Sequence, residues 1–197
     1  DQKKIKKAIA TYQKVIAINP NFYKAHNNLG IAFKELKQSE SAIKSYEMAI
    51  SINPSYDEAH NNLGSLLKDL GRPYEAVESY QKAIIINQNN SETHNYLAIT
   101  LMQLGKLNES IESYKKAIAI NPNYEEAHNN LGVALNKVGQ FEEALKSYEK
   151  ALSIEPEYAE AYYNRGHLMK DLNLLDQAVL NYECAINLKP GLDCNFG

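Results

Sequence analysis

Histidine and asparagine, whose side chains can bind metals or peptides, recur together in one motif of this chain. The sequence AHNNLG occurs at residues 25–30, 59–64 and 127–132, and the looser copies THNYLA and AYYNRG occupy residues 93–98 and 161–166. Imidazole nitrogens ligate metals and carry protons, whereas an amide side chain both donates and accepts hydrogen bonds. The motif is either a binding site that recurs along the chain or a structural element that recurs because it packs one repeat on the next.

The histidine of the motif occurs four times at the same position. Equivalent points on two stacked helices lie about 8–10 Å apart, whereas the ligand nitrogens of a zinc ion lie about 2 Å from the metal. The spacing therefore predicts neither a metal site nor a bound cofactor. Each ring is expected to pack half-buried between helices and to hydrogen-bond a neighbouring polar group, which applies to His26, His60, His94 and His128.

The two asparagines of the motif differ in where a helix would place them. On a wheel of about 100° per residue, Ala25 and Leu29 share the packed side, Asn27 points away from it and Asn28 lies at its flank. An amide pairs with the backbone of any peptide, so we predict a ladder that holds an extended peptide. Solvation, hydrogen bonds between repeats and inheritance from a duplicated unit are the alternatives. The ladder, with the two tyrosines that interrupt it, comprises Asn27, Asn28, Asn61, Asn62, Asn95, Tyr96, Asn129, Asn130, Tyr163 and Asn164.

Two further pairs on the same segments are weaker candidates for ligand contact. Lys34 and Lys68 repeat at one open-face position and suit an acidic ligand, although a solvated side chain is the ordinary state of such lysines. Tyr163 and His167 lie one helical turn apart and suit an aromatic anchor for a peptide. An unremarkable surface is the alternative for this second pair.

The cysteines and charges of the chain argue against several classes of protein. Cys184 and Cys194 are too few for a disulfide framework, which favours a reducing, cytoplasmic setting, and Cys184 is expected to be a small buried thiol. No nucleophile-elbow, phosphate-loop, zinc-protease or dinucleotide-binding motif occurs, so no catalytic activity is predicted. A net charge of −3 argues against a nucleic-acid partner. No run of about 18 apolar residues predicts a membrane span, and no secretory signal opens the chain.

The motif belongs to a period of 34 residues that covers almost the whole chain. Alanine, tyrosine and proline recur in the same register, as at Ala42, Tyr46 and Pro54. Apolar residues at helical spacing predict two helices in each unit. A glycine in the left-handed conformation is expected to end the first helix, at Gly71, Gly105 and Gly139.

The starts of the first helices also carry a signal. Ser55-x-x-Glu58 matches a capping box, and Asn89-x-x-Glu92 and Asn123-x-x-Glu126 imitate it. We therefore assign these glutamates to helix starts rather than to a binding site.

A helix–turn–helix unit with Leu-Gly, Ala, Tyr, Ala and Pro at these offsets resembles the tetratricopeptide repeat. The resemblance implies an all-α, right-handed superhelical solenoid of antiparallel helix pairs over residues 1–190. Residues 1–22 resemble the second helix of a repeat, and 191–197 are expected to be a tail that begins a downstream region. Full repeats are expected near residues 23–56, 57–90, 91–124, 125–158 and 159–190.

The chain departs from the family pattern at four kinds of position. Histidine replaces the usual aromatic residue at the fourth position of the repeat, and Arg165 stands where leucine is normal. Lys37 and Asn173 replace the turn glycine. The carboxylate clamp of the family needs lysine at the fifth position and asparagine at the ninth, whereas this chain has pairs such as Asn27 and Ile31.

The resemblance also implies a function. In this family the first helices form a concave groove, and asparagine at the sixth position contacts bound peptide, which predicts a protein-interaction scaffold with a peptide partner. Repeats such as NPNYEEAHNNLG are most similar to those of O-linked N-acetylglucosamine transferase-type proteins, so recruiting substrates for a larger enzyme is one alternative. Self-association through uncapped terminal repeats is another.

Overall fold

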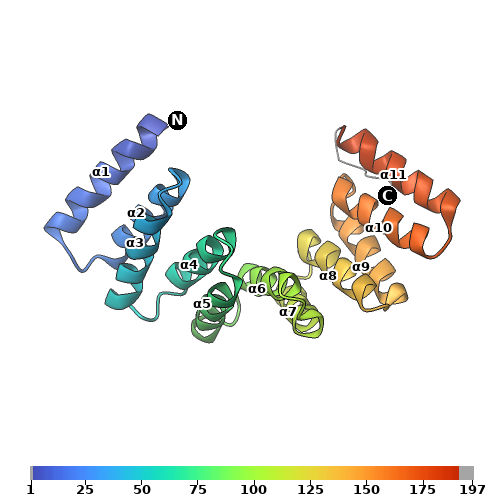
Figure 1. The fold of residues 1–197 in the computed structure, drawn as a ribbon, viewed down its shortest axis with the longest axis horizontal. Coiled ribbons are helices and arrows are strands. Elements are labelled where there is room, and N and C mark those ends of the chain that lie inside the picture. The colour runs from blue at the N-terminus through green and yellow to red at the C-terminus, as the bar shows by residue number, and fades with distance from the viewer. Residues whose placement is uncertain (1, 191–197) are drawn as a thin grey trace. The chain divides into compact units, whose positions relative to one another are not determined.

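The structure, a computed structural model, describes residues 2–190 as a succession of helices (Figure 1). No strand occurs between these residues, so the predicted all-α class is confirmed. The expectations for Cys194 and for the tail 191–197 lie outside the described residues. The helices are α1 (Gln2–Ile18), α2 (Tyr23–Glu35), α3 (Ser39–Ile52), α4 (Asp57–Asp69), α5 (Pro73–Ile86), α6 (Ser91–Gln103), α7 (Leu107–Ile120), α8 (Glu125–Lys137), α9 (Phe141–Ile154), α10 (Ala159–Asp171) and α11 (Leu175–Leu188).

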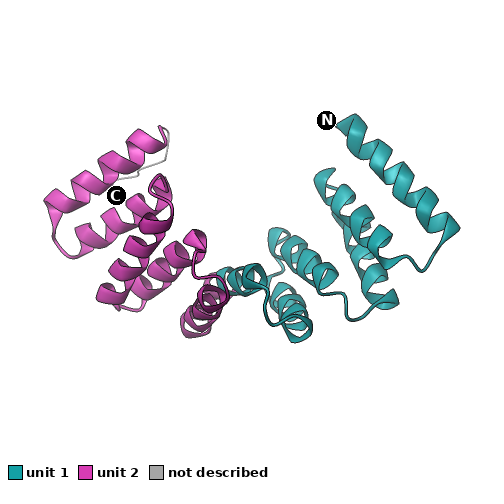
Figure 2. Cartoon of the chain, turned by 180° about the vertical axis from the view of Figure 1, so that it is seen from behind, with its two compact units in different colours: residues 1–100 teal, residues 101–197 magenta. Residues whose placement is uncertain are grey.

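Figure 2 shows two compact units. We refer to residues 1–100 as the N-terminal unit and to residues 101–197 as the C-terminal unit, and α6 contributes residues to both. In the N-terminal unit the first helices α2 and α4 pack against the second helices α3 and α5. In the C-terminal unit α8 pairs with α9 and α10 pairs with α11. Consecutive antiparallel helix pairs are the arrangement of a solenoid.

A glycine and a tyrosine fix the close approach within each pair. The ring of Tyr46 on α3 lies so near Gly30 on α2 that a Cβ there would stand 2.6 Å from the tyrosine Cε1. The same distance separates Tyr148 from a Cβ at Gly132. Burial raises the pKa of Tyr46 and of Tyr148 above its usual value. The leucine-glycine step of the motif is therefore a packing feature.

The turns inside the pairs confirm the expected left-handed residues. Gly71, Gly105 and Gly139 have φ values of 73°, 74° and 80°. Lys37 and Asn173 occupy the same turn position with φ values of 58° and 60°. A residue with a Cβ is strained in this region, and asparagine tolerates it better than lysine.

The capping boxes predicted for α4 and α8 are wrong. The N-cap residues of α4 and α8 are Tyr56 and Tyr124, and neither makes a side-chain cap bond. The turn before α4 is instead stabilised by Asn53, whose Oδ1 accepts the backbone N–H of Ser55 at 3.2 Å. The Glu58 carboxylate instead accepts hydrogen bonds from the side chains of Asn27 and Tyr56.

Candidate functional site

The fifth-position asparagines do not face away from the packing, so the wheel prediction is wrong for three of them. Asn27 and Asn95 are 0% exposed, Asn129 is 3% exposed, and Asn61 is half-buried. In the N-terminal unit α2 contacts α4, and in the C-terminal unit α8 contacts α10. This side of a first helix is therefore covered by the first helix of the next repeat.

In the N-terminal unit, Asn27 is the centre of a hydrogen-bonded network between repeats. Its Nδ2 donates to Glu58 Oε1 at 3.1 Å and to Tyr56 Oη at 3.4 Å. Its Oδ1 accepts from Asn62 Nδ2 at 3.0 Å. Tyr56 donates to Glu58 Oε2 at 2.6 Å, and burial followed by this carboxylate raises the pKa of Tyr56. The inter-repeat alternative for the amides is therefore present in the structure.

The C-terminal unit repeats part of this network. Asn164 Nδ2 donates to Asn129 Oδ1 at 3.0 Å, and Asn129 Nδ2 donates to Asn130 Oδ1 at 3.4 Å. Burial first, and then the charge of Glu126 and neighbouring carboxylates, raise the pKa of Tyr158 to about 12. Glu160 accepts a bond from Lys189 at 2.7 Å.

These networks involve tyrosines that the sequence argument passed over and glutamates that it assigned to helix starts. Tyrosine stands two residues before glutamate at the start of α4, α8 and α10. The recurrence of Tyr-x-Glu at 34-residue spacing, as in Tyr56 and Glu58, was the available signal. At the start of α4 this phenol and this carboxylate contact Asn27 of the preceding repeat.

The hydrogen bonds between successive asparagines are interrupted at Asn61, because a tyrosine replaces the asparagine that would donate to it. The Oδ1 atom of Asn61 is buried and has no hydrogen-bond partner among residues 2–190. In this register the donor equivalent to Asn62 is Tyr96, whose ring lies 6.1 Å from that of Tyr80. The missing amide therefore leaves an acceptor unused.

The sixth-position asparagines are half-buried and remain candidates for ligand contact; they are Asn28, Asn62, Asn130 and Asn164. Asn28 lines a pocket of about 270 Å³ between α1 and α2, together with Tyr12 and Ile31. Asn62 and Asn164 each donate through Nδ2 to a buried asparagine of the preceding repeat. Their amide planes are thereby fixed.

The two candidate lysines contact other residues of the N-terminal unit. Lys34 Nζ donates to Ser65 Oγ at 2.9 Å and lies 3.0 Å from Asp69 Oδ2. Lys68 Nζ lies 3.9 Å from Asp69 Oδ1. The contacts of Lys34 connect α2 to α4, whereas the contact of Lys68 lies within α4.

The structure brings Tyr163 and His167 together at the predicted spacing. Their ring centroids are 4.7 Å apart in an edge-to-face arrangement. The ring of Tyr182 on α11 lies 5.8 Å from Tyr163 and 5.6 Å from His167. Both members of the pair are half-buried, so part of each ring is open to a ligand.

The four histidines occupy a packing role, as predicted. Each Nε2 donates to the carbonyl of the residue six positions earlier, at 2.9 Å for His26, 3.2 Å for His60, 3.1 Å for His94 and 3.0 Å for His128. Burial lowers the pKa of His60 and His128. Within the described part of the chain, no three His, Cys, Asp or Glu side chains lie where they could hold a metal ion.

Comparison with known protein families identifies the repeats. Models described as TPR repeat match residues 1–37, 100–139 and 134–173, and models described as tetratricopeptide repeat match residues 23–56, 57–90, 79–112 and 159–191. The chain belongs to the tetratricopeptide repeat family. This membership supports a protein-interaction scaffold as its general function.

Solved structures of this family share the fold. The crystal structure of MamA is 26% identical with a TM-score of 0.76, and the match covers 82% of this chain and 95% of MamA. PilF of Pseudomonas aeruginosa is 20% identical with a TM-score of 0.83, covering 96% and 86%. YrrB, described as a TPR protein with an unusual peptide-binding site, is 22% identical with a TM-score of 0.76, covering 92% and 93%.

A search of curated protein sequences found no match. None of the helices within residues 2–190 is long and apolar enough to cross a membrane.

Proposed function

We propose that the chain is a protein-interaction scaffold that holds an extended peptide segment against its first helices. The observation that carries the proposal is the state of Asn62 and Asn164. Each amide uses its Nδ2 for the preceding repeat, and its Oδ1 makes no hydrogen bond among the described residues. A half-buried acceptor held in a fixed orientation suits a peptide N–H.

The chemistry of the site favours recognition of backbone over side chains. An amide acceptor pairs with the N–H of any residue other than proline. The lysine and asparagine of the carboxylate clamp are absent, which disfavours a ligand held by its C-terminal carboxylate at this face. YrrB has the same fold and, by its description, a peptide-binding site.

The test compares two variants that break the same hydrogen bond from opposite sides. Asn62→Ala removes both the bond to Asn27 and the free acceptor, whereas Asn27→Ala removes the bond and keeps the acceptor. Peptides selected from a random 12-residue library are titrated against both variants by fluorescence polarisation. Loss of one peptide hydrogen bond of about 1 kcal/mol weakens binding roughly fivefold in Asn62→Ala. Equal affinity of Asn62→Ala and the unmodified chain, with helicity intact, contradicts the proposal.

Exposed apolar side chains favour self-association as a second candidate function. On α11, Leu175 is 58% exposed and Val179 is 54% exposed, and α1 has no buried residue. Apolar surface of this kind pairs with another copy when it is contiguous. Sedimentation velocity over a hundredfold concentration range tests this candidate, since a monomer at every concentration removes it. Recruitment of substrates for a glycosyltransferase stays a prediction from the resemblance of the repeats.

A further inference from the structure

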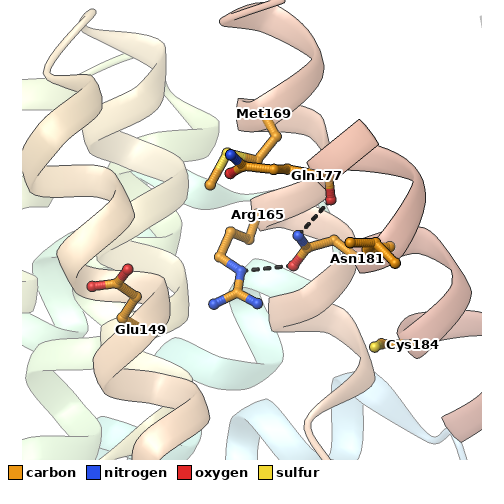
Figure 3. Close-up of a pocket in the computed structure, with 7 residues that line it drawn as sticks. Glu149, Arg165, Met169, Gln177, Asn181 and Cys184 are labelled. Carbon is orange, nitrogen blue, oxygen red and sulfur yellow. Dashed lines mark hydrogen bonds between the residues drawn. The ribbon is translucent and has the colours of Figure 1, made fainter. Parts of the chain in front are cut away.

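A pocket of about 300 Å³ lies between the second helices α9 and α11, with residues of the first helix α10 also lining it (Figure 3). An arginine of α10, Arg165, lies at its floor, and α9 contributes Glu149 to the opposite wall. Apolar lining comes from Met169 and Leu180, and Cys184 is an exposed thiol at α11 rather than the buried one expected.

The corresponding groove one repeat earlier has different chemistry. Between α7 and α9 a pocket of about 370 Å³ is lined by Leu131, Ser147 and Lys150, which precede Arg165, Asn181 and Cys184 by 34 residues. The same groove thus occurs beside a repeat in the middle of the unit, and its position does not depend on α11 being the last described helix. Among the lining positions that change, the one at the floor goes from leucine to arginine, and lysine gives way to Glu149, Leu180 and Cys184.

The change from leucine to arginine is matched by a second change that holds the new side chain. In the other repeats a serine occupies the position of Asn181 and donates to the carbonyl four residues earlier, as Ser147 does to Glu143 at 2.8 Å. Asn181 keeps this bond, donating through Nδ2 to the Gln177 carbonyl at 2.8 Å. Its Oδ1 also accepts from Arg165 Nε at 2.6 Å.

The Arg165 guanidinium is fixed from two sides but has no charged partner. Its Cζ lies 5.4 Å from the centre of the Tyr162 ring, which adds a cation–π contact to the bond with Asn181. Among residues 2–190 it forms no ion pair within 4.0 Å, with Glu149 or any other carboxylate. Since Nε is occupied, the two terminal nitrogens present N–H groups in one plane to the pocket.

We propose that Arg165 binds a carboxylate group of a partner protein, with an adjacent apolar side chain packed on Met169 and Leu180. Two parallel N–H groups match the two oxygens of a carboxylate. Glu149 on the opposite wall repels a doubly charged phosphate more strongly than a singly charged carboxylate. The site takes Arg165 and Met169 from the first helix α10 and its other lining residues from the second helices α9 and α11, and none of the sixth-position asparagines lines it.

Small carboxylates test the site directly by NMR on the ¹⁵N-labelled chain. N-acetyl-leucine represents a C-terminal carboxylate beside an apolar side chain, and N-acetyl-aspartate amide represents an acidic side chain. We expect at least one to shift the amide signals of Gln177 and Asn181, saturating at millimolar concentrations on the order expected for a single anchored group. The compound that binds identifies the source of the carboxylate. If neither compound binds, the proposal is overturned. The proposal is also overturned if the neutral N-acetyl-leucinamide binds as tightly as the carboxylates, or if inorganic phosphate binds more tightly than they do.

Two variants connect the signal to the arginine. Arg165→Leu restores the residue of the other four full repeats, Leu29, Leu63, Leu97 and Leu131, so the fold is expected to persist. We expect it to weaken carboxylate binding at least tenfold. Asn181→Ser, which restores the serine of the other repeats, is expected to weaken binding severalfold by releasing Nε. Unchanged binding by Arg165→Leu, with an unchanged melting temperature, overturns the proposal.

Discussion

Equivalent residues of the N-terminal and C-terminal units form different hydrogen bonds. In each, a sixth-position amide donates to the buried fifth-position amide of the preceding repeat at 3.0 Å. The glutamate beside them differs, because Glu58 accepts from Asn27 and Tyr56 whereas Glu160 accepts from Lys189.

The residue that follows the next helix of the chain also differs between the units. The residue equivalent to Lys189 in the N-terminal unit is Asn87, which donates to Asp57 Oδ2 at 2.8 Å. Position 159, equivalent to Asp57, is alanine, so Lys189 bonds the next carboxylate, that of Glu160. Identical motifs therefore do not guarantee identical hydrogen bonds; the charges beside them decide which bonds form.

The largest expected effect is the loss of Asn27. Asn27→Ala removes bonds to a carboxylate, a phenol and an amide, and we expect it to lower the free energy of unfolding by about 2 kcal/mol. Asn129→Ala removes bonds to the amides of Asn130 and Asn164, and we expect it to lower the free energy of unfolding by about 1 kcal/mol. Urea denaturation followed by circular dichroism measures both. Equal losses would show that the two networks contribute equally despite their different partners.

Substitutions to glycine at the left-handed turn residues are expected to raise the free energy of unfolding rather than lower it. Lys37→Gly relieves a strained backbone at φ 58°, and we expect a gain of about 1 kcal/mol in the free energy of unfolding. Asn173→Gly is expected to gain less, since asparagine tolerates this region. Gly71→Ala serves as the reverse control and should lose stability. A larger gain at Asn173 than at Lys37 contradicts the argument.

Acidification should lower the stability of both units, because each contains a buried histidine of the repeated motif. Burial lowers the pKa of His60 and His128 below 6.5, with Lys82 and Lys150 adding to the decrease and the Pro54 and Pro122 carbonyls opposing it. The unfolded chain then binds protons more readily than the folded chain, so this stability is present above about pH 6.5 and lost as the pH falls through the folded-state pKa.

Urea midpoints at pH 7.5 and 5.5 measure the loss. The double variant His60→Gln with His128→Gln should show a smaller decrease than the unmodified chain between these pH values. Because both rings keep some contact with solvent, we expect the effect to be smaller than that of Asn27→Ala. An undiminished decrease in the double variant would assign the pH dependence to other groups.

The smallest expected effect concerns the ion pair between Glu160 and Lys189 in the C-terminal unit. Glu160→Gln removes an ion pair in which Lys189 is 57% exposed and Glu160 is 44% exposed. Such a pair contributes about 0.5 kcal/mol or less. Glu58→Gln, which weakens an acceptor for the buried Asn27, should cost more. Thermal unfolding of the two variants side by side tests the order, and a greater loss in Glu160→Gln reverses it.

What the sequence predicted well depends on local periodicity. The helices, the left-handed turns at Gly71 and its equivalents, and the packing role of His60 follow from spacing within one repeat. The burial of Asn27 does not, because a wheel drawn for one helix omits the neighbouring first helix that covers it. The role of Glu58 was misassigned for the same reason, since its partner lies 31 residues earlier.

The pocket at Arg165 shows a different limit of sequence reasoning. Arginine in place of leucine was visible as a departure from the family pattern, and Asn181 in place of serine was also visible. Their relation was not, because a separation of 16 residues on two helices has meaning only once the pair is packed.

The glycine–tyrosine contact has a consequence for recombining this chain. Gly30 and Tyr46 lie in one repeat, as do Gly132 and Tyr148, so a repeat transplanted whole carries both halves of that contact. The amide bond from Asn62 to Asn27 instead crosses a junction. Recombination of whole repeats therefore preserves this contact, but the polar and apolar residues that meet across each junction, such as Tyr46 and Leu66, must still be matched.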